Sequence, residues 1–221
     1  MLKVRRAVRD LLYLLNQGYP RESAVNFVSN HYRLPLAERH LLARCVFSER
    51  EVNEHRKKAV GLSGVRGRRL GIDGYNVLIT MESLLMGKQV VLCNDGFIRD
   101  LRAIFGKYRA GPATPRAIAE LIGVVARAEP KEVVVFFDKQ VSHSGELAAE
   151  IRDRIKKAGL CGDAVAESGV DTKLRGFDVV ASSDRAVIER AKKVWDIPQE
   201  LMWLKRRRIL DVKKLINSSS N

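Results

Sequence analysis

The chain of 221 residues has only three cysteines, and aromatic residues make up just 6% of it. Cys45, Cys93 and Cys161 are far apart and odd in number, which fits neither a disulfide framework nor a CxxC metal site. No apolar run approaches the ~20 residues that a membrane-spanning helix needs. The N-terminal apolar segment is interrupted by Arg9 and Asp10, and no small-residue cleavage site follows. We therefore expect a soluble, cytoplasmic protein with reduced thiols and no membrane partner.

Several motifs of familiar enzyme classes are absent as well. The chain has no GxxxxGKS/T or GxGxxG loop, no GxSxG elbow and no HExxH pair. The four histidines, at positions 31, 40, 55 and 143, are scattered. His143 follows Asp138 closely and could touch a substrate, although a lone loop histidine is more often simply solvated. A nucleotide cofactor and a serine or zinc hydrolase therefore lose their usual sequence support.

Positive charge is the strongest compositional feature of the chain. The net charge is +14, from 40 Lys and Arg against 26 Asp and Glu. Residues 1–69 hold fifteen basic and six acidic side chains, residues 70–204 hold nineteen of each, and residues 205–221 hold six and one. A basic excess at both ends points to a polyanionic partner, most simply nucleic acid. The alternative is that it only aids solubility.

The first third of the chain reads as helices. Apolar residues between Val4 and Leu15 recur at helical spacing, and Ser48 with Glu51 forms a capping-box pattern. The stretch 21–47 could also be two helices of a helix-turn-helix, although its connector is long and lacks Gly. The Gly-rich residues 61–67 are the best boundary candidate. We expect three parts: a helical basic domain over 1–62, a second domain over 68–204, and a basic tail over 205–221.

From Arg69 onward, short strands alternate with helical periods. "RLGID", "VVVFFD" and "DVVASS" are predicted strands, and helices are predicted at about 97–109, 115–128 and 144–158, with Thr114 and Ser183 as helix caps. Residues 90–94 could be a strand or a hairpin arm. This alternation predicts a parallel sheet covered by helices, which is an α/β layer fold.

Three of the predicted strands run into an aspartate. Asp73, Asp138 and Asp184 stand at or just after strand ends, and Asp171 lies shortly before the last strand. The carboxyl ends of parallel strands share one edge of a sheet, so these carboxylates should converge and repel one another. Mg²⁺ or Mn²⁺ would resolve that conflict, because both prefer oxygen ligands. Each aspartate alone could equally be an ordinary turn or cap residue.

The segments "DGYNVL", "VVFFD" and "VVASSDRAVI" together resemble the PIN-like superfamily, especially its NYN branch, which includes YacP-type ribonucleases. The likeness covers residues 69 to about 200. The whole chain also resembles an archaeal family in which a helical domain of unknown function precedes such a PIN-like part. The resemblance implies a three-layer α/β/α domain with a central parallel sheet, preceded by a small all-α domain.

The same resemblance implies a metal-dependent endonuclease that hydrolyses RNA. By position, Asp73, Asp138 and Asp184 would be metal ligands, Asn76 would orient a ligand or the scissile phosphate, and Asp171 would be the acid that begins a helix before the last strand. The match weakens around Asp171, because that helix must be very short. It weakens again where Ala186 replaces a second acid.

RNA is the expected partner, as tRNA, rRNA or mRNA, with the ribosome as a further candidate. A catalytically weak or inactive RNA- or ribosome-binding protein is one alternative, and a DNA-binding regulator that uses the helical part is another. The basic residues near the acids and in the two basic ends would contact phosphates. They are Arg66, Arg68, Arg69, Lys139, Lys173, Arg175, Arg185, Lys205, Arg206, Arg207 and Arg208.

Overall fold

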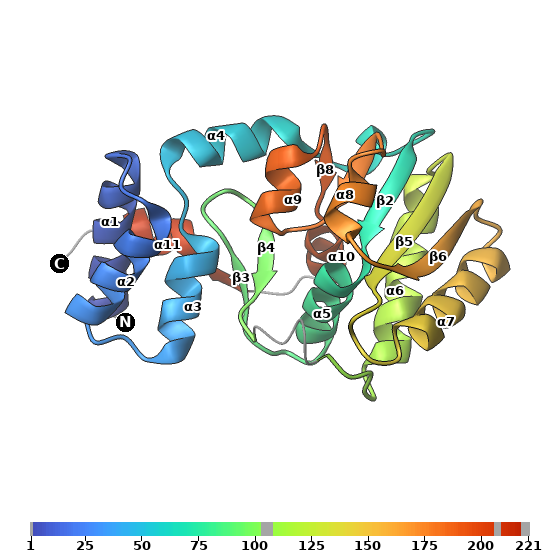
Figure 1. The fold of residues 1–221 in the computed structure, drawn as a ribbon, viewed down its shortest axis with the longest axis horizontal. Helices are drawn as coiled ribbons and strands as arrows, with labels where there is room; N and C mark the ends of the chain where they lie inside the picture. The colour runs from blue at the N-terminus through green and yellow to red at the C-terminus, as the bar shows by residue number, and fades with distance from the viewer. Residues whose placement is uncertain (1, 103–107, 206–208, 218–221) are drawn as a thin grey trace. The chain divides into compact units, whose positions relative to one another are not determined.

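The structure of the protein is a computed structural model that describes residues 2–102, 108–205 and 209–217 (Figure 1). The chain forms two compact units, which we call the helical unit and the sheet unit. Among the described residues, no helix is long and apolar enough to cross a membrane. The helical unit comprises Met1–Lys57, Gln89–Ala103 and Arg208–Asn221, and the sheet unit comprises Lys58–Lys88 and Ile104–Arg207.

The sheet unit is built on a six-stranded parallel sheet with the strand order β1-β8-β7-β2-β5-β6. The β-branched and aromatic residues of the inner strands are buried on both faces, as a parallel sheet covered by helices requires. The predicted α/β fold with a central parallel sheet is confirmed. The strands are β1 Ala59–Val60, β2 Arg69–Asp73, β5 Glu132–Asp138, β6 Gly162–Glu167, β7 Val179–Ala181 and β8 Val194–Trp195.

Helices flank this sheet (Figure 1). Two of the predicted helices, 115–128 and 144–158, are present with nearly the expected bounds. Thr114 is the first residue of its helix rather than the cap, which is Ala113. The helices are α5 Gly74–Leu85, α6 Thr114–Ala128, α7 Ser144–Lys157, α8 Val170–Leu174, α9 Arg185–Arg190 and α10 Ile197–Leu204, with a 3-10 turn at Leu62–Gly64.

The step from β2 into α5 depends on Gly74. A Cβ at this position would lie 2.5 Å from Cε1 of Phe137 and 2.8 Å from the carbonyl oxygen of Phe136. We expect Gly74→Ala to lower the free energy of unfolding by about 1–3 kcal/mol, because the neighbouring strand must shift. Gly123→Ala is the control: its Cβ would meet nothing within 4 Å inside α6. It should stabilise by about 0.5–1 kcal/mol, and urea titration of both variants checks the pair. Equal free energies of unfolding for the two variants would contradict the close packing of Gly74 against Phe136 and Phe137.

The helical unit combines an all-helical N-terminal segment with a small sheet. The capping box is confirmed: the backbone N–H of Ser48 donates to Oε2 of Glu51 at 2.9 Å, and the N–H of Glu51 donates to Oγ of Ser48 at 3.3 Å. The helices are α1 Leu2–Asn16, α2 Arg21–His31, α3 Leu36–Cys45, α4 Glu49–Lys58 and α11 Val212–Asn217, and the strands are β3 Val90–Leu92, β4 Ile98–Asp100 and β9 Leu210–Asp211.

The helix predicted at 97–109 is wrong at its start, where Ile98–Asp100 forms strand β4. β3 and β4 are an antiparallel hairpin, and β9 pairs with β3 in parallel. Gly96 has φ +98° in the connecting turn, a value that favours glycine. Residues 89–102 and 209–217 therefore belong with the N-terminal helices, so the helical unit is made of three chain segments, where the sequence suggested a plain N-terminal domain and a separate tail.

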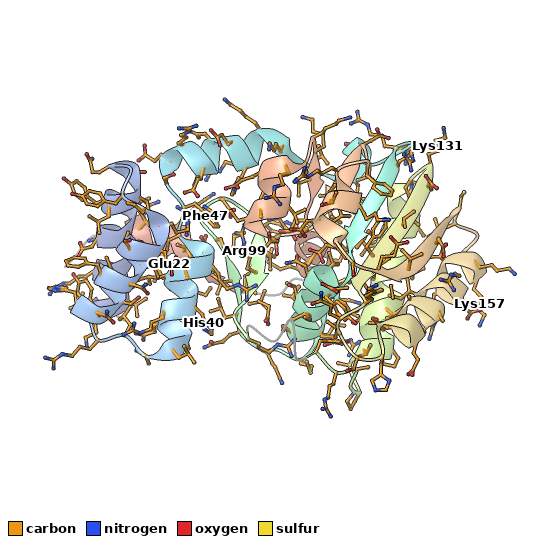
Figure 2. All side chains as sticks on the ribbon, viewed as in Figure 1. Glu22, His40, Phe47, Arg99, Lys131 and Lys157 are labelled. Carbon is orange, nitrogen blue, oxygen red and sulfur yellow. The ribbon has the colours of Figure 1, made fainter. Side chains whose placement is uncertain are left out.

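A buried ionic cluster joins the hairpin to α4 inside the helical unit. Asp95, in the turn, is 1% exposed. Its Oδ2 contacts Nδ1 of His55 at 2.8 Å, and both carboxylate oxygens accept hydrogen bonds from Arg99 at 2.8 and 2.7 Å. The Arg99 guanidinium lies 4.5 Å from the ring centre of Phe47 (Figure 2). Burial raises the pKa of Asp95, but Arg99 and His55 outweigh it and hold that pKa well below its usual range.

Candidate active site

Three neighbouring strands of the sheet lead into acidic residues at one edge. β2 ends at Asp73, β5 ends at Asp138, and Asp184 stands three residues after the end of β7. Because β7, β2 and β5 are adjacent and parallel, their carboxyl ends lie together, where α/β folds commonly bind ligands. Asp73 is therefore on the middle strand, between the other two.

Asp73 is the buried member of this group, with 8% of its surface exposed. Its Oδ1 accepts a hydrogen bond from the N–H of Asn76 at 3.3 Å, and its Oδ2 accepts one from the hydroxyl of Ser182 at 3.0 Å. Burial raises the pKa of Asp73 to about 7; the two hydrogen bonds act against this, while the charges of Asp184 and Asp171 add to it. A cation would restore the charged form of this carboxylate.

Two serines connect Asp73 and Asn76 to the segment after β7. Oδ1 of Asn76 accepts hydrogen bonds from both the N–H and the hydroxyl of Ser183, at 2.8 and 3.1 Å. The hydroxyl oxygen of Ser182, which donates to Asp73, also accepts from the N–H of Asp184 at 3.1 Å. The side chain of Asn76 is therefore committed to holding the loop, and through it the position of Asp184.

Asp184 has a structural role of its own. Its Oδ1 accepts from the N–H groups of Ala186 and Val187 at 2.8 and 3.3 Å, so Asp184 is the N-cap of α9. The sequence had suggested Ser183 for that role, and this was wrong. Asp184 is nevertheless exposed, and its negative charge raises the pKa of Asp73. Both of the hydrogen bonds that cap α9 go to the same carboxylate oxygen, Oδ1.

The side chains of Asp138 and Asp171 have partners outside the hydrogen-bond network of Asp73. Oδ1 of Asp138 accepts from the N–H of Gln140 at 2.9 Å, and the charge of Asp138 acts on Tyr75. Asp171 is in the five-residue helix α8, which is as short as the sequence required. It forms a 3.8 Å ion pair with Arg190 on the surface. Asp171 still contributes to the electrostatics of Asp73.

The carboxylate oxygens of these residues are of the type that a hard divalent cation prefers, but three of them are not gathered around one point. Among the described residues, no group of three or more His, Cys, Asp or Glu side chains is arranged around one ion position. Among the residues that the structure describes, Asp73, Asp138 and Asp184 form no ion pair with a basic side chain. Mg²⁺ usually takes only one or two protein carboxylates and keeps several waters. Asp73 and Asp184 are the pair that suits such an ion.

The basic residues expected to contact RNA are divided between the two edges of the sheet. Arg66, Arg68 and Arg69 lie before or at the start of β2, opposite the aspartates, where Arg66 pairs with Glu129 and Arg69 with Glu132. Lys205 pairs with Glu120. Arg206, Arg207 and Arg208 lie outside the described residues.

Three further cations, Lys139, Lys173 and Arg185, follow the carboxyl ends of β5, β6 and β7 along the chain. Lys173 pairs with Glu167 at 2.6 Å, and Arg185 lies 3.6 Å from Glu189. Lys139 is exposed and forms no ion pair within the described part of the chain. Arg175 is exposed as well, but it directly precedes Gly176, whose carbonyl oxygen accepts a hydrogen bond from Arg69 at the amino edge of the sheet. This edge therefore carries acids at its centre and cations around them.

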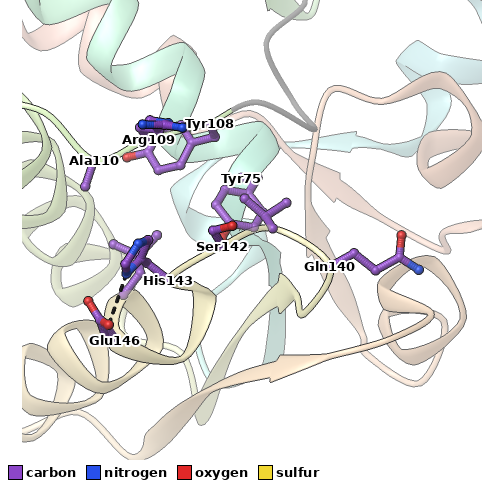
Figure 3. A pocket seen from close by; sticks show the side chains of 10 residues that line it. Tyr75, Tyr108, Arg109, Ala110, Gln140, Ser142, His143 and Glu146 are labelled. Carbon is purple, nitrogen blue, oxygen red and sulfur yellow. Dashed lines mark hydrogen bonds and ion pairs between the residues drawn. The ribbon is translucent and has the colours of Figure 1, made fainter.

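A cavity of about 850 Å³ opens at the same edge, beside the β5 end (Figure 3). Its walls come from the start of α5, the loop after β5, the start of α7 and the residues before α6. Burial, followed by the charge of Asp138, raises the pKa of Tyr75 to about 12. His143 has a left-handed backbone, with φ 63°, and its Nδ1 lies 3.0 Å from Glu146. The lining residues include Tyr75, Tyr108, Arg109, Gln140, Ser142 and His143.

A buried carboxyl group supports one wall of this cavity. Glu82, 4% exposed in α5, accepts hydrogen bonds from the hydroxyls of Tyr108 and Thr114, both at 2.6 Å. Burial and the hydrogen bond to Glu82 raise the pKa of Tyr108. Sequence reasoning missed this network, because Glu82 lies within an apolar helix and its partners are 26 and 32 residues away. Ser182 and Ser183 were visible in the motif but were not assigned a site role.

Comparison with known proteins places this arrangement in a family. Residues 62–200 match the family described as Domain of unknown function (DUF5616), and residues 3–58 match the one described as Protein of unknown function (DUF434). The chain belongs to the DUF5616 family. A protein of Methanocaldococcus jannaschii, described as uncharacterized, is 35% identical over 209 residues, which cover 93% of this chain and all of that protein.

The DUF5616 region, residues 62–200, contains the whole candidate site from Asp73 to Asp184. The DUF434 region lies within the helical unit, apart from its last residue. The resemblance found in the sequence is therefore supported for its two-domain arrangement, and the parallel sheet fits a PIN-like fold. No solved structure matches the chain.

Proposed function

We propose that this member of the DUF5616 family is a PIN-like, metal-dependent endoribonuclease that hydrolyses RNA phosphodiester bonds in the cytoplasm. The observation that carries the proposal is the buried carboxylate of Asp73, whose pKa of about 7 reflects burial and the nearby charges of Asp184 and Asp171. A carboxyl group in such a place is costly to ionise, which is a common property of functional sites. The motif resemblance around Asp73, Asp138 and Asp184 supplies the reaction class.

Asp73 and Asp184 would hold the Mg²⁺ or Mn²⁺ ion in this proposal. The metal, when bound, would activate a water molecule and stabilise negative charge on the phosphate. Ser182 and Asn76 are positioning residues, because they fix Asp73 and the loop that bears Asp184. Lys139, which forms no ion pair among the described residues, would bind a phosphate next to the cleaved bond.

The cavity beside Asp138 would receive the nucleotide next to the cleaved bond. Tyr75 and Tyr108 have ring centres 5.2 Å apart, and Tyr75 touches Phe137. Arg109 lies on the same wall and could bind a phosphate, while His143 lies across the opening (Figure 3). The cavity volume of about 850 Å³ leaves room for a nucleotide.

Cleavage assays test this function. The full-length protein should cut labelled tRNA, rRNA or mRNA fragments with Mg²⁺ or Mn²⁺, and a chelator should abolish the cutting. Asp184→Asn should slow it about tenfold to a hundredfold through weaker metal binding, while asparagine still caps α9. Asp163→Asn, at the start of β6 on the opposite edge, is the matched control and should cut normally. Cutting that persists in chelator, or that Asp184→Asn leaves unchanged, would refute the proposal.

A catalytically weak RNA-binding protein is the second candidate. It is favoured by the lack of a three-ligand metal group among the described residues and by Ala186 at the position of a second acid. This candidate predicts tight RNA binding that neither chelator nor Asp184→Asn alters, with no new RNA ends. Duplex DNA in the same assay separates both from a DNA-binding regulator, which would prefer one duplex sequence.

A further inference from the structure

An aromatic groove lies between α1 and α2 of the helical unit, far along the chain from the acidic edge. Its volume is about 240 Å³. Tyr13 comes from α1, Phe27 and His31 come from α2, and Tyr32 follows α2 directly. We call these four side chains the aromatic groove. The groove lies entirely in the region that matches DUF434, and this region contains none of the candidate active-site residues.

The aromatic groove exposes large rings to solvent. Phe27 is 65% exposed and Tyr13 is 64% exposed. The other described phenylalanines are all buried, so Phe27 is an exception within this chain: Phe47, Phe97, Phe136, Phe137 and Phe177. Exposed rings that gather around a groove mark an interaction site more often than isolated ones do.

The rings are arranged by the helix that bears them. Phe27 and His31 are four residues apart on α2, and their ring planes are within 14° of parallel, with centres 6.3 Å apart. Tyr32 packs edge-on against His31 at 4.8 Å, and its hydroxyl donates to Asp10 at 2.6 Å. These contacts favour one arrangement of Phe27, His31 and Tyr32 before any ligand binds, which lowers the entropy cost of binding.

The charges near the aromatic groove indicate the chemical class of ligand that it binds. Residues 2–33 hold six Lys and Arg against only two acidic residues, Asp10 and Glu22. Asp10 is already engaged by the Tyr32 hydroxyl, and Arg6 is close enough to lower the pKa of Tyr32 against that effect. A ligand that suits both the flat rings and Arg6 beside them has planar apolar groups on an anionic backbone. Unpaired nucleotides have that combination, because their bases stack on aromatic side chains.

We propose that the aromatic groove binds unpaired bases of single-stranded RNA. Tyr13 and Phe27 stack the bases, and Arg6 binds the backbone. The inference rests on RNA being the ligand of the proposed function, but it does not depend on cleavage. It gives the helical unit the task of binding the single-stranded part of the substrate.

Binding of fluorescein-labelled single-stranded RNA decamers, followed by anisotropy in chelator, tests the groove without cutting. Tyr13→Ala and Phe27→Ala should each raise Kd about fivefold to a hundredfold, because one stacked base is lost. Tyr13→Phe keeps the ring and should bind as the wild type does. Tyr19→Ala is the control, since Tyr19 is 57% exposed but does not line the groove. Arg6→Gln should instead reduce the salt dependence of binding.

The groove variants should leave the salt slope and the circular dichroism spectrum unchanged, because both side chains are largely exposed. Equal RNA affinity of wild type and both alanine variants overturns the inference. So does a change from dimer to monomer in Phe27→Ala by analytical ultracentrifugation, because the groove would then hold a second copy of the chain. Weaker binding by the variants together with absent cleavage would support the groove while removing the nuclease proposal, so the two are separable.

Discussion

Asp95→Asn should lower the free energy of unfolding by about 3–5 kcal/mol, one of the two largest effects that we expect from a single substitution in this chain. Asparagine has the same shape, but it removes the charge opposite Arg99, which is 3% exposed. A buried guanidinium that loses its carboxylate keeps the cost of leaving water and loses the attraction that offset it. Chemical denaturation at neutral pH measures the change.

The hairpin gives this pair its importance for the fold. The N–H of Phe97 also donates to Oδ1 of Asp95. Asn94, which directly precedes Asp95, makes two hydrogen bonds with the backbone of Phe47. The segment 89–102 therefore contacts the N-terminal helices through buried polar groups. Loss of Asp95 should loosen the hairpin before the rest of the unit, which hydrogen exchange at β3 and β4 would report.

Two comparisons separate charge from shape in this prediction. Glu54→Gln breaks the exposed Arg50–Glu54 pair, whose side chains are 87% and 51% exposed, and should cost less than about 0.5 kcal/mol. The double variant Asp95→Asn/Arg99→Gln should be more stable than Asp95→Asn alone, because no buried charge is left without its partner. An effect of Asp95→Asn below about 1 kcal/mol would show that Arg99 finds other compensation.

The sheet was predictable because its signals are local, whereas the composition of the helical unit was not. β2 and β5 are apolar runs that end in Asp, β7 is an apolar run that ends at Ala181, and each of α6 and α7 shows a helical period over 14 or more residues. The hairpin at 90–100 has arms of three residues, too short for a period. Its signal was the Asp95–Gly96 pair, which favours a tight turn between extended arms.

The candidate site shows the same division between local and distant information. Asp73, Asp138 and Asp184 could be placed at one edge from strand ends alone. The pairings that define the site could not, because Ser182 and Asp73 are 109 residues apart and Ser183 and Asn76 are 107 apart. The carboxylates can be identified from the sequence, but only the fold shows that Asp73 is buried and that Asp184 caps a helix.

Asp73→Asn should abolish most of the proposed RNA cleavage and at the same time stabilise the protein at alkaline pH. Cleavage should fall a hundredfold or more, because the buried ligand of the metal is lost. Fold damage is not expected: the amide keeps an oxygen for the N–H of Asn76, and the hydroxyl oxygen of Ser182 can accept from the new NH₂ group. A loss of activity caused by unfolding is thereby distinguished from a loss of chemistry.

The stability effect follows from the direction of the pKa shift. Asp73 has a pKa of about 7 in the folded protein against an ordinary value of 3.8, so between these pH values the folded state holds a proton that the unfolded state has released. Its contribution to stability is fully present below about pH 4 and is lost as the pH rises through about 7. That loss amounts to at most about 4 kcal/mol, since one pKa unit corresponds to about 1.4 kcal/mol.

The difference in unfolding free energy between Asp73→Asn and the wild type should therefore grow from pH 4 to pH 8 in chelator, in favour of the variant. Asp178→Asn, at the start of β7 on the opposite edge, should show no such growth. Mn²⁺ at pH 8 should then raise the melting temperature of the wild type but not of Asp73→Asn, because only the carboxylate gains a partner. In the proposed nuclease, a bound cation would offset the stability cost of this buried acid. An Asp73→Asn variant that is less stable than the wild type at pH 8 and still cuts RNA would leave Asp73 as a helix cap.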